Sequence, residues 1–376
     1  MKTVRILVWI LCACFASVAW GQQPTCGVDT PWAEFHRQNM MRWNRCERVL
    51  NVNNVGNLAL KWGHRTSGPV QTSSAVAKGV VYVGDNSDVY ALKASTGAKL
   101  WSYPVSAATS SPAVANGVVY VSSQDGSVYA LNAGTGTLLW SFNTSNFGES
   151  SPTVANGVVY VGASDNNVYA LNAKTGALLW SYATNFFVYS SPAVANGVVY
   201  FGAGDHNIYA LNASTGALLW SYTTGNSVYT SPAVANGVVY VGSVDGNVYA
   251  LHADTGVLLW SYATGDLVYH SSPAVANGVV YIGSGDSNVY ALDADIGTLL
   301  WSYTTGGFVH SSPAVANGVV YVGSDDKNLY ALNASTGAKL WSYPTGQESE
   351  SSPVVLNGVV YIGSLDSNKV YAFGLK

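Results

Sequence analysis

The sequence predicts an all-β fold, an eight-bladed β-propeller whose blades are four-stranded antiparallel sheets. Two observations predict it. A unit of about forty residues recurs along most of the 376-residue chain, so that "SSPAVANGVVY" at residues 271–281 returns unchanged at residues 311–321. Each unit also holds four short apolar runs separated by turn sequences. Because repeats of this length stack into one continuous core, we expect one propeller domain rather than the several domains that length alone would suggest.

The unit at residues 190–222 shows the four strands in order. "SSPAVA" is the first strand, and Asn196-Gly197 follows it as a two-residue hairpin turn whose central positions need positive φ. "VVYFG", "IYALN" and "ALLWSY" are the second, third and fourth strands, separated by "AGDHN" and "STG". The second strand has no polar face, which predicts burial on both sides. Such strands, repeated and packed face to face around an axis, make a propeller.

The two ends of the chain complement each other. The last unit, from Ser351, supplies three strands and ends without the tryptophan that closes each earlier unit. "NLALKW", which ends at Trp62, supplies a matching fourth strand at the other end. An N-terminal strand that completes the last blade would close the ring and remove exposed sheet edges. We therefore divide the chain into a signal peptide at 1–21, an N-terminal strap at 22–57 and the propeller at 58–376.

The first residues are typical of a secretory leader, with two basic residues, an apolar run and then small residues. We expect cleavage after Gly21, a periplasmic or extracellular location, and no transmembrane span afterwards. The alternative is a lipoprotein acylated at Cys14. After cleavage at Gly21 only Cys26 and Cys46 remain, and two cysteines in an exported chain suggest one disulfide that holds the strap.

The charge distribution excludes one class of partner. Charged residues make up 10% of the chain, against about a quarter in most globular proteins. Every Arg beyond the leader lies between residues 37 and 65, whereas residues 66–376 carry eight Lys against seventeen Asp and Glu, a net charge of −9. Nucleic acid binding needs clustered cations, so an acidic body of this kind should not bind it. We expect the basic strap to dock on the acidic body.

The segment "ALNASTGALLW" at residues 210–220 matches the motif A-x-[DN]-x-x-T-G-x-x-x-W. This motif resembles the docking motif of quinoprotein, or PQQ-like, repeat propellers, and the resemblance extends over about residues 32–376. The match weakens at Lys93, His252 and Ile296. The resemblance implies that a large indole fills the wedge between neighbouring blades at the outer radius. The tryptophans in this position are Trp62, Trp101, Trp140, Trp180, Trp220, Trp260, Trp301 and Trp341.

The resemblance implies two possible functions. The family contains alcohol and sugar dehydrogenases that bind PQQ and calcium, and also cofactor-free members such as the lipoprotein of the outer-membrane β-barrel assembly machine. The dehydrogenases carry an adjacent cysteine pair and long insertions between blades, and this sequence has neither beyond its leader. We therefore expect a monomeric, non-catalytic binding or scaffold protein without a cofactor or catalytic residues. A PQQ- and calcium-dependent dehydrogenase is the alternative.

One position varies from unit to unit while its surroundings repeat. It lies two residues before the Ser of each "SP" and ends the loop that enters the first strand, so all eight copies should lie on one face of the ring near its axis. We expect this mouth to bind a protein, peptide or glycan, helped by the neighbouring Phe147, Phe187, Phe308, Tyr269 and Glu348. The eight residues are Gln71, Thr109, Glu149, Tyr189, Tyr229, His270, His310 and Glu350.

Two further groups of side chains suggest metal binding. His270, His310 and Glu350 occupy the mouth position of three consecutive units, and two His with a carboxylate are a known ligand set for a transition metal. An Asp also recurs at one turn of each unit from Asp125 to Asp366, which would suit calcium. At this turn position we favour a structural role, because Asp bonds its own turn backbone.

Overall fold

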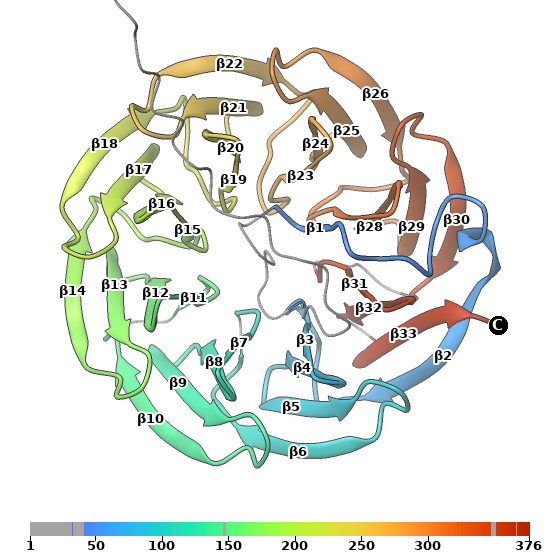
Figure 1. The fold of residues 1–376 in the computed structure, drawn as a ribbon, viewed down its shortest axis with the longest axis horizontal. Coiled ribbons are helices and arrows are strands. Elements are labelled where there is room, and N and C mark those ends of the chain that lie inside the picture. The colour runs from blue at the N-terminus through green and yellow to red at the C-terminus, as the bar shows by residue number, and fades with distance from the viewer. Residues whose placement is uncertain (1–31, 33–40, 109, 146–147, 347–350, 366) are drawn as a thin grey trace, which may run out of the picture.

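The computed structural model describes residues 32, 41–108, 110–145, 148–346, 351–365 and 367–376, and these form eight blades around a central axis. Figure 1 looks down this axis and shows the blades as separate sheets that follow one another around the ring in chain order. The predicted all-β, eight-bladed propeller is confirmed. Among the described residues no helix is long and apolar enough to span a membrane.

Each blade has four antiparallel strands, which follow one another in the sheet from the axis outward. The innermost strands are β3 (Ala75–Ala77), β7 (Ala113–Ala115), β11 (Thr153–Ala155), β15 (Ala193–Ala195), β19 (Ala233–Ala235), β23 (Ala274–Ala276), β27 (Ala314–Ala316) and β31 (Val354–Leu356). The second strands are β4 (Val80–Gly84), β8 (Val118–Ser122), β12 (Val158–Gly162), β16 (Val198–Gly202), β20 (Val238–Gly242), β24 (Val279–Gly283), β28 (Val319–Ser324) and β32 (Val359–Ser364).

The outer half of each blade carries the docking motif. The third strands are β5 (Asp88–Lys93), β9 (Ser127–Asn132), β13 (Asn167–Asn172), β17 (Asn207–Asn212), β21 (Asn247–His252), β25 (Asn288–Asp293), β29 (Asn328–Asn333) and β33 (Lys369–Leu375). The outermost strands are β6 (Lys99–Pro104), β10 (Leu138–Asn143), β14 (Leu178–Ala183), β18 (Leu218–Thr223), β22 (Leu258–Ala263), β26 (Leu299–Thr304), β30 (Lys339–Pro344) and β2 (Leu58–Arg65).

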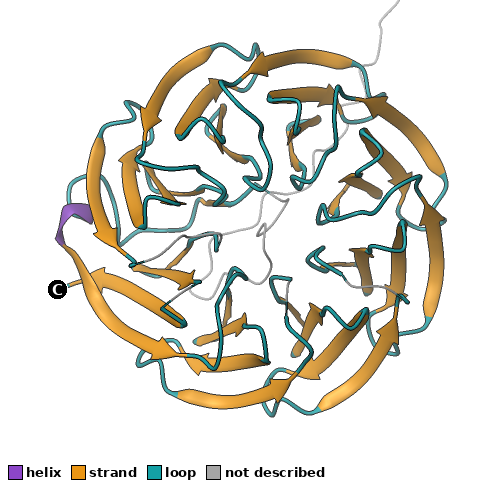
Figure 2. Cartoon of the chain, turned by 180° about the vertical axis from the view of Figure 1, so that it is seen from behind, coloured by secondary structure: helices purple, strands orange, loops and turns teal. Residues whose placement is uncertain are grey.

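The N-terminal strand β2 closes the ring as the sequence predicts. It pairs antiparallel with β33, from Leu58 opposite Leu375 to Arg65 opposite Lys369. The eighth blade is therefore β2-β33-β32-β31, built from both ends of the chain. Figure 2 shows the short 3-10 helix η2 (Val55–Asn57), which leads into β2, beside the C-terminus.

The strap adds a contact that the repeat pattern does not contain. Strand β1 (Trp43–Asn44) pairs parallel with β27, so the seventh blade has five strands instead of four. The same segment continues across the inner strands of its neighbours, because Met41 accepts a hydrogen bond from the Val275 amide on β23. Trp32 accepts another from the Val76 amide on β3. Trp32 and residues 41–44 thus lie along the innermost strands of the first, sixth and seventh blades.

The hydrophobic core lies between blades rather than within them. One cluster joins Tyr200 and Trp220 of the fourth blade to Val239 and Tyr249 of the fifth, and similar clusters follow around the ring. The second strands are buried almost throughout, as expected for strands that have a neighbouring blade on each face. Each blade therefore needs its neighbours to bury its apolar faces.

Candidate functional site

The mouth of the ring contains a pocket of about 320 Å³. Five of the predicted mouth residues line it, namely Gln71, Glu149, Tyr189, Tyr229 and His270. Each of them lies just before the innermost strand of its blade. Because the innermost strands surround the axis, the five residues meet there although they come from five different blades. His310 is beside the pocket, with its ring centroid 5.7 Å from that of His270. Thr109 and Glu350 lie outside the described residues.

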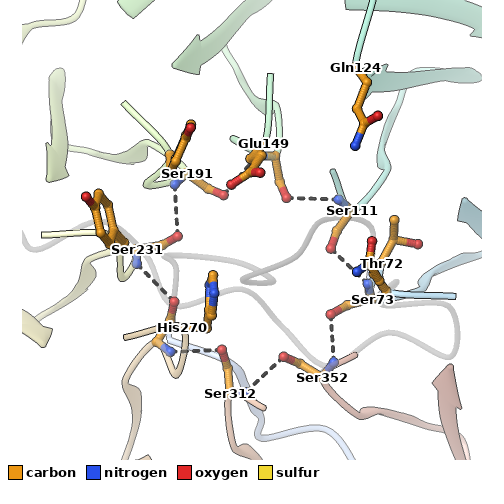
Figure 3. A pocket seen from close by; sticks show the side chains of 15 residues that line it. Thr72, Ser73, Ser111, Gln124, Glu149, Ser191, Ser231, His270, Ser312 and Ser352 are labelled. Atoms are coloured by element: carbon orange, nitrogen blue, oxygen red, sulfur yellow. Dashed lines mark hydrogen bonds between the residues drawn. The ribbon is translucent and has the colours of Figure 1, made fainter. Parts of the chain in front are cut away.

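Eight serines form a closed hydrogen-bonded ring around the pocket (Figure 3). In each blade the backbone N–H of one serine donates to the Oγ of the equivalent serine in the next blade, at 2.9–3.0 Å. The ring closes when Ser352 donates to the Oγ of Ser73 at 2.9 Å. Its members are Ser73, Ser111, Ser151, Ser191, Ser231, Ser272, Ser312 and Ser352, which we call the serine ring.

The residue before each serine of the ring has a different role. Its hydroxyl oxygen accepts the backbone N–H at the end of the second strand of the same blade, as Ser190 does from Gly202 at 3.1 Å. Equivalent bonds occur in all eight blades, with Thr72 and Thr230 replacing serine in two of them. The repeated "SS" therefore combines a bond within the blade and a bond between blades. The sequence analysis treated it only as part of a strand.

An arc of aromatic rings forms one side of the mouth. Phe187 stacks on Tyr189 and on Tyr229, with ring centroids 4.2 and 5.7 Å apart and interplanar angles of 26° and 14°. Tyr269 continues the arc with an edge-to-face contact to Tyr229 at 5.3 Å and contacts His270 at 4.1 Å. Aromatic faces of this kind give a large, rigid contact area. Phe147 and Glu348 lie outside the described residues.

The rest of the described lining is polar and uncharged apart from one carboxylate. Gln71 and Gln124 contribute amide groups, and Glu149 contributes the carboxylate. No Lys or Arg is among the described residues that line the pocket. Burial lowers the pKa of His270, and the neighbouring His310 lowers it further, against a smaller opposite effect of Asp325. His270 is therefore neutral at pH 7.

Blade seven carries a contact between a histidine and an aspartate that the sequence analysis missed. His310 Nδ1 lies 3.1 Å from Asp325 Oδ2, and both side chains are largely buried. The other buried oxygen of Asp325, Oδ1, has no hydrogen-bond partner among the described residues. The second to sixth and the eighth blades have no acidic residue at the position of Asp325, so the doubled "DD" in "SDDKN" was the available signal; the residues there are Gln124, Ser164, Gly204, Val244, Gly285 and Leu365.

The predicted metal set of His270, His310 and Glu350 is incomplete in the described structure, because Glu350 lies outside it. No group of three or more His, Cys, Asp or Glu among the described residues could hold a metal ion. The metal site stays a prediction. Cys46 of the strap is disulfide-bonded, and its predicted partner Cys26 lies outside the described residues, so the Cys26–Cys46 pairing stays a prediction.

The recurring aspartates make structural bonds in the turns. Asp245 accepts hydrogen bonds from the hydroxyl of Tyr249 at 2.6 Å, from the amide of Asn247 at 2.9 Å and from the amide of Gly225 at 2.7 Å. Gly225 follows the outermost strand of the preceding blade, so this carboxylate links two blades. Burial raises the pKa of Asp245, but these hydrogen bonds outweigh burial and lower it overall.

Comparisons with known proteins support the family resemblance. The family model described as outer membrane protein assembly factor BamB matches residues 47–186, 187–304 and 267–376. A search of curated proteins finds no match.

Three solved structures illustrate how widely this fold is used. The quinohemoprotein alcohol dehydrogenase ADHIIG from Pseudomonas putida HK5 has a TM-score of 0.81 at 19% identity, and the match covers 92% of this chain and 80% of that one. BamB from Moraxella catarrhalis has a TM-score of 0.74 at 20% identity, covering 84% and 99%. The computationally designed Ika8 protein has a TM-score of 0.74 at 20% identity, covering 83% and 98%. At these identities the likeness shows the fold alone.

Proposed function

The chain belongs to the outer membrane protein assembly factor BamB family of PQQ-like repeat propellers, and on this premise we propose that it is an exported, non-catalytic binding or scaffold protein. Its partner would be a protein, peptide or glycan of the cell envelope, held at the mouth of the ring. One observation carries the proposal. Side chains that differ from repeat to repeat gather around a single pocket at the mouth, while the repeated residues build the ring.

The division between repeated and varied residues supports a binding role. The hydrogen-bonding residues of the serine ring and the aspartate turns recur in blade after blade, and their bonds account for the repetition. The residue at the mouth position is not part of these repeated bonds, and from blade to blade it carries an aromatic, amide, acidic or imidazole group. Loops held on a rigid scaffold are where proteins usually place binding residues.

Redox catalysis with PQQ is the alternative, because the structural neighbours include a quinohemoprotein alcohol dehydrogenase. PQQ is a flat quinone that carries several carboxylates, and a site for it needs cationic partners. The described pocket lining offers Glu149 and no Lys or Arg, so it fits this group poorly.

A capture experiment tests the proposal. The native protein and a Tyr189→Ala/Tyr229→Ala variant would be immobilised and exposed to an extract of the cell envelope. The matched control is Tyr222→Ala/Tyr262→Ala, which removes two tyrosines from the outermost strands of the same two blades. We expect a bound species that the native protein and the control retain and the mouth variant loses. Equal capture by all three proteins would contradict the proposal, as would dye reduction when PQQ, calcium and an alcohol are added.

A further inference from the structure

We infer that the ligand of the mouth pocket is a neutral saccharide, an inference that rests on the proposed binding function and names the class of ligand. Three features of the pocket lead to it: the hydroxyl groups of the serine ring, the aromatic arc on one side, and the balance of charge.

The serine ring leaves hydroxyl protons available to a ligand. Each Oγ accepts one N–H from the preceding blade, and within the described residues none of the eight hydroxyls donates to a protein acceptor. All eight serines line the pocket. A hydroxyl can donate one hydrogen bond and accept two, so each Oγ keeps its donor and one acceptor site. The pocket therefore has donors and acceptors spread around its circumference.

A saccharide ring fits this distribution. Its hydroxyls radiate from the rim of the ring, and each can both donate and accept, as the serines can. Gln71 and Gln124 add amide donors and acceptors, and Glu149 adds an acceptor for sugar hydroxyls. An extended peptide offers donors and acceptors along two edges only, which would use fewer of the groups that surround the pocket.

The aromatic arc supplies the other half of saccharide recognition. The C–H groups on the face of a sugar ring carry partial positive charge, and the face of an aromatic ring carries partial negative charge. Tyr189 and Tyr229 line the pocket together with the serine ring, and Phe187 stacks on both of them, which supports the two pocket-lining rings. The cavity of about 320 Å³ is at the small end of the range for ligand pockets, which suits one sugar ring or the end of a chain.

The charges favour a neutral ligand over an ion. The hydroxyl donors alone would suit an anion, but Glu149 would repel one, and no Lys or Arg lies in the described lining to offset it. The pocket is thus rich in hydrogen-bonding groups and poor in positive charge.

Titration with named sugars tests the inference. The native protein would be screened on an array of neutral glycans and then titrated calorimetrically with glucose, galactose, N-acetylglucosamine, maltose and chitobiose, with sodium sulfate as the anion probe. We expect saturable binding of at least one neutral saccharide and no binding of sulfate. Binding of sulfate without any saccharide would overturn the inference.

Two adjacent serines provide a matched pair of variants. Ser191→Ala removes a hydroxyl from the pocket, whereas Ser190→Ala removes one that faces its own blade, and each change leaves one backbone N–H without its acceptor. We expect Ser191→Ala to weaken saccharide binding about fivefold, as the loss of one hydrogen bond of about 1 kcal/mol requires. Ser190→Ala should leave binding within about twofold of native. Equal effects of the two variants would contradict direct contact with the serine ring.

The outcomes separate the inference from the proposed function. One outcome is that no saccharide binds, but the native chain retains a protein from the envelope extract that the Tyr189→Ala/Tyr229→Ala variant loses. In that case the assignment of a saccharide ligand is wrong and the proposed binding function stands. If neither saccharide nor envelope component binds at the mouth, both are wrong.

Discussion

The indole N–H of Trp220 donates a 2.8 Å hydrogen bond to the carbonyl oxygen of Ala253 in the next blade. The same oxygen accepts the hydroxyl of Tyr200 at 3.2 Å. Equivalent tryptophan bonds connect the successive blades, and Trp341 donates instead to Leu58, at 3.2 Å, where the N-terminal strand completes the ring. The contact between two blades, which we call the joint, therefore consists of a packed indole and one backbone carbonyl that accepts hydrogen bonds from both the Trp and the Tyr of the preceding blade.

Replacing Trp220 with Ala should destabilise the protein without altering the mouth. Trp220 is 8% exposed, and large-to-small changes of buried aromatic residues cost about 3–5 kcal/mol. Trp220→Phe keeps most of the ring and loses the hydrogen bond, so it should cost less. Thermal and urea unfolding measure both effects. An unchanged melting temperature for Trp220→Ala would show that the joint does not stabilise the ring.

The glycine that contacts this indole should tolerate no side chain. Gly256 has a φ of +70°, and a β-carbon there would lie 2.7 Å from the ring of Trp220. Gly197 has a φ of +78°, but a β-carbon there would meet no atom within 4 Å. Gly197→Ala therefore introduces backbone strain without a steric clash. We expect Gly197→Ala to cost about 1 kcal/mol and Gly256→Ala clearly more. Equal losses in urea unfolding would mean that the contact with Trp220 is unimportant.

Tyr321 should be better replaced by Phe. In the first six blades this tyrosine donates to an Ala carbonyl in the next blade, as Tyr281 does to Ala334 at 3.0 Å. That carbonyl belongs to the turn between the third and fourth strands, and the eighth blade lacks the turn because its strands come from opposite ends of the chain. The hydroxyl of Tyr321 is buried and has no partner among the described residues.

An unpaired buried hydroxyl costs about 1–3 kcal/mol, so Tyr321→Phe should raise the melting temperature. Tyr281→Phe, which gives up a hydrogen bond, should lower it by an amount equivalent to about 1 kcal/mol. Differential scanning calorimetry compares the two. A lower melting temperature for Tyr321→Phe would reveal a partner for that hydroxyl.

Arg42 should hold the strap on the ring. Its side chain is fully buried and donates to the carbonyls of Pro313 and Pro353, both at 2.8 Å, in the seventh and eighth blades. Burial lowers the pKa of Arg42 to about 9, so it stays charged at pH 7. Arg42→Met should lower stability by about 2 kcal/mol and speed proteolysis of the strap, while Arg48→Met, at an exposed position, serves as the control. Identical proteolysis of the two variants would contradict this role.

The aspartate turns should make the protein sensitive to acid. The pKa values of Asp245 and Asp286 are lower in the folded state than the unfolded value of about 3.9. Their stabilisation is therefore complete above that value and is lost as the pH falls through the folded-state pKa. Asp245→Asn should flatten the dependence of the urea midpoint on pH below about pH 4. Asp254→Asn, in an exposed turn, should leave the slope as in the native protein.

Much of the fold follows from short-range patterns in the chain. The repeated "ANG" turn, the apolar second strand and the motif ending in Trp recur often enough to predict eight blades, and "NLALKW" predicts how the ring closes. The structure has β2 paired with β33 as expected. The sequence predicts which positions lie at the mouth. It does not predict which of these residues share a pocket, because that depends on the size of the closed ring and the tilt of its blades.

The sequence by itself determined the blade, its turns and the position where repeats differ, because these depend on neighbours within a few residues and on a strand period of two. Only the tertiary structure decided that eight serines hydrogen-bond in a ring, that Asp325 pairs with His310, that Arg42 of the strap is buried against the seventh and eighth blades and that Tyr321 lacks an acceptor among the described residues. The serine ring and the surroundings of Arg42 and Tyr321 depend on contacts between blades or between the ends of the chain, and they are complete only once the ring has closed. The contact of Asp325 with His310 lies within one blade and depends on how two of its loops meet.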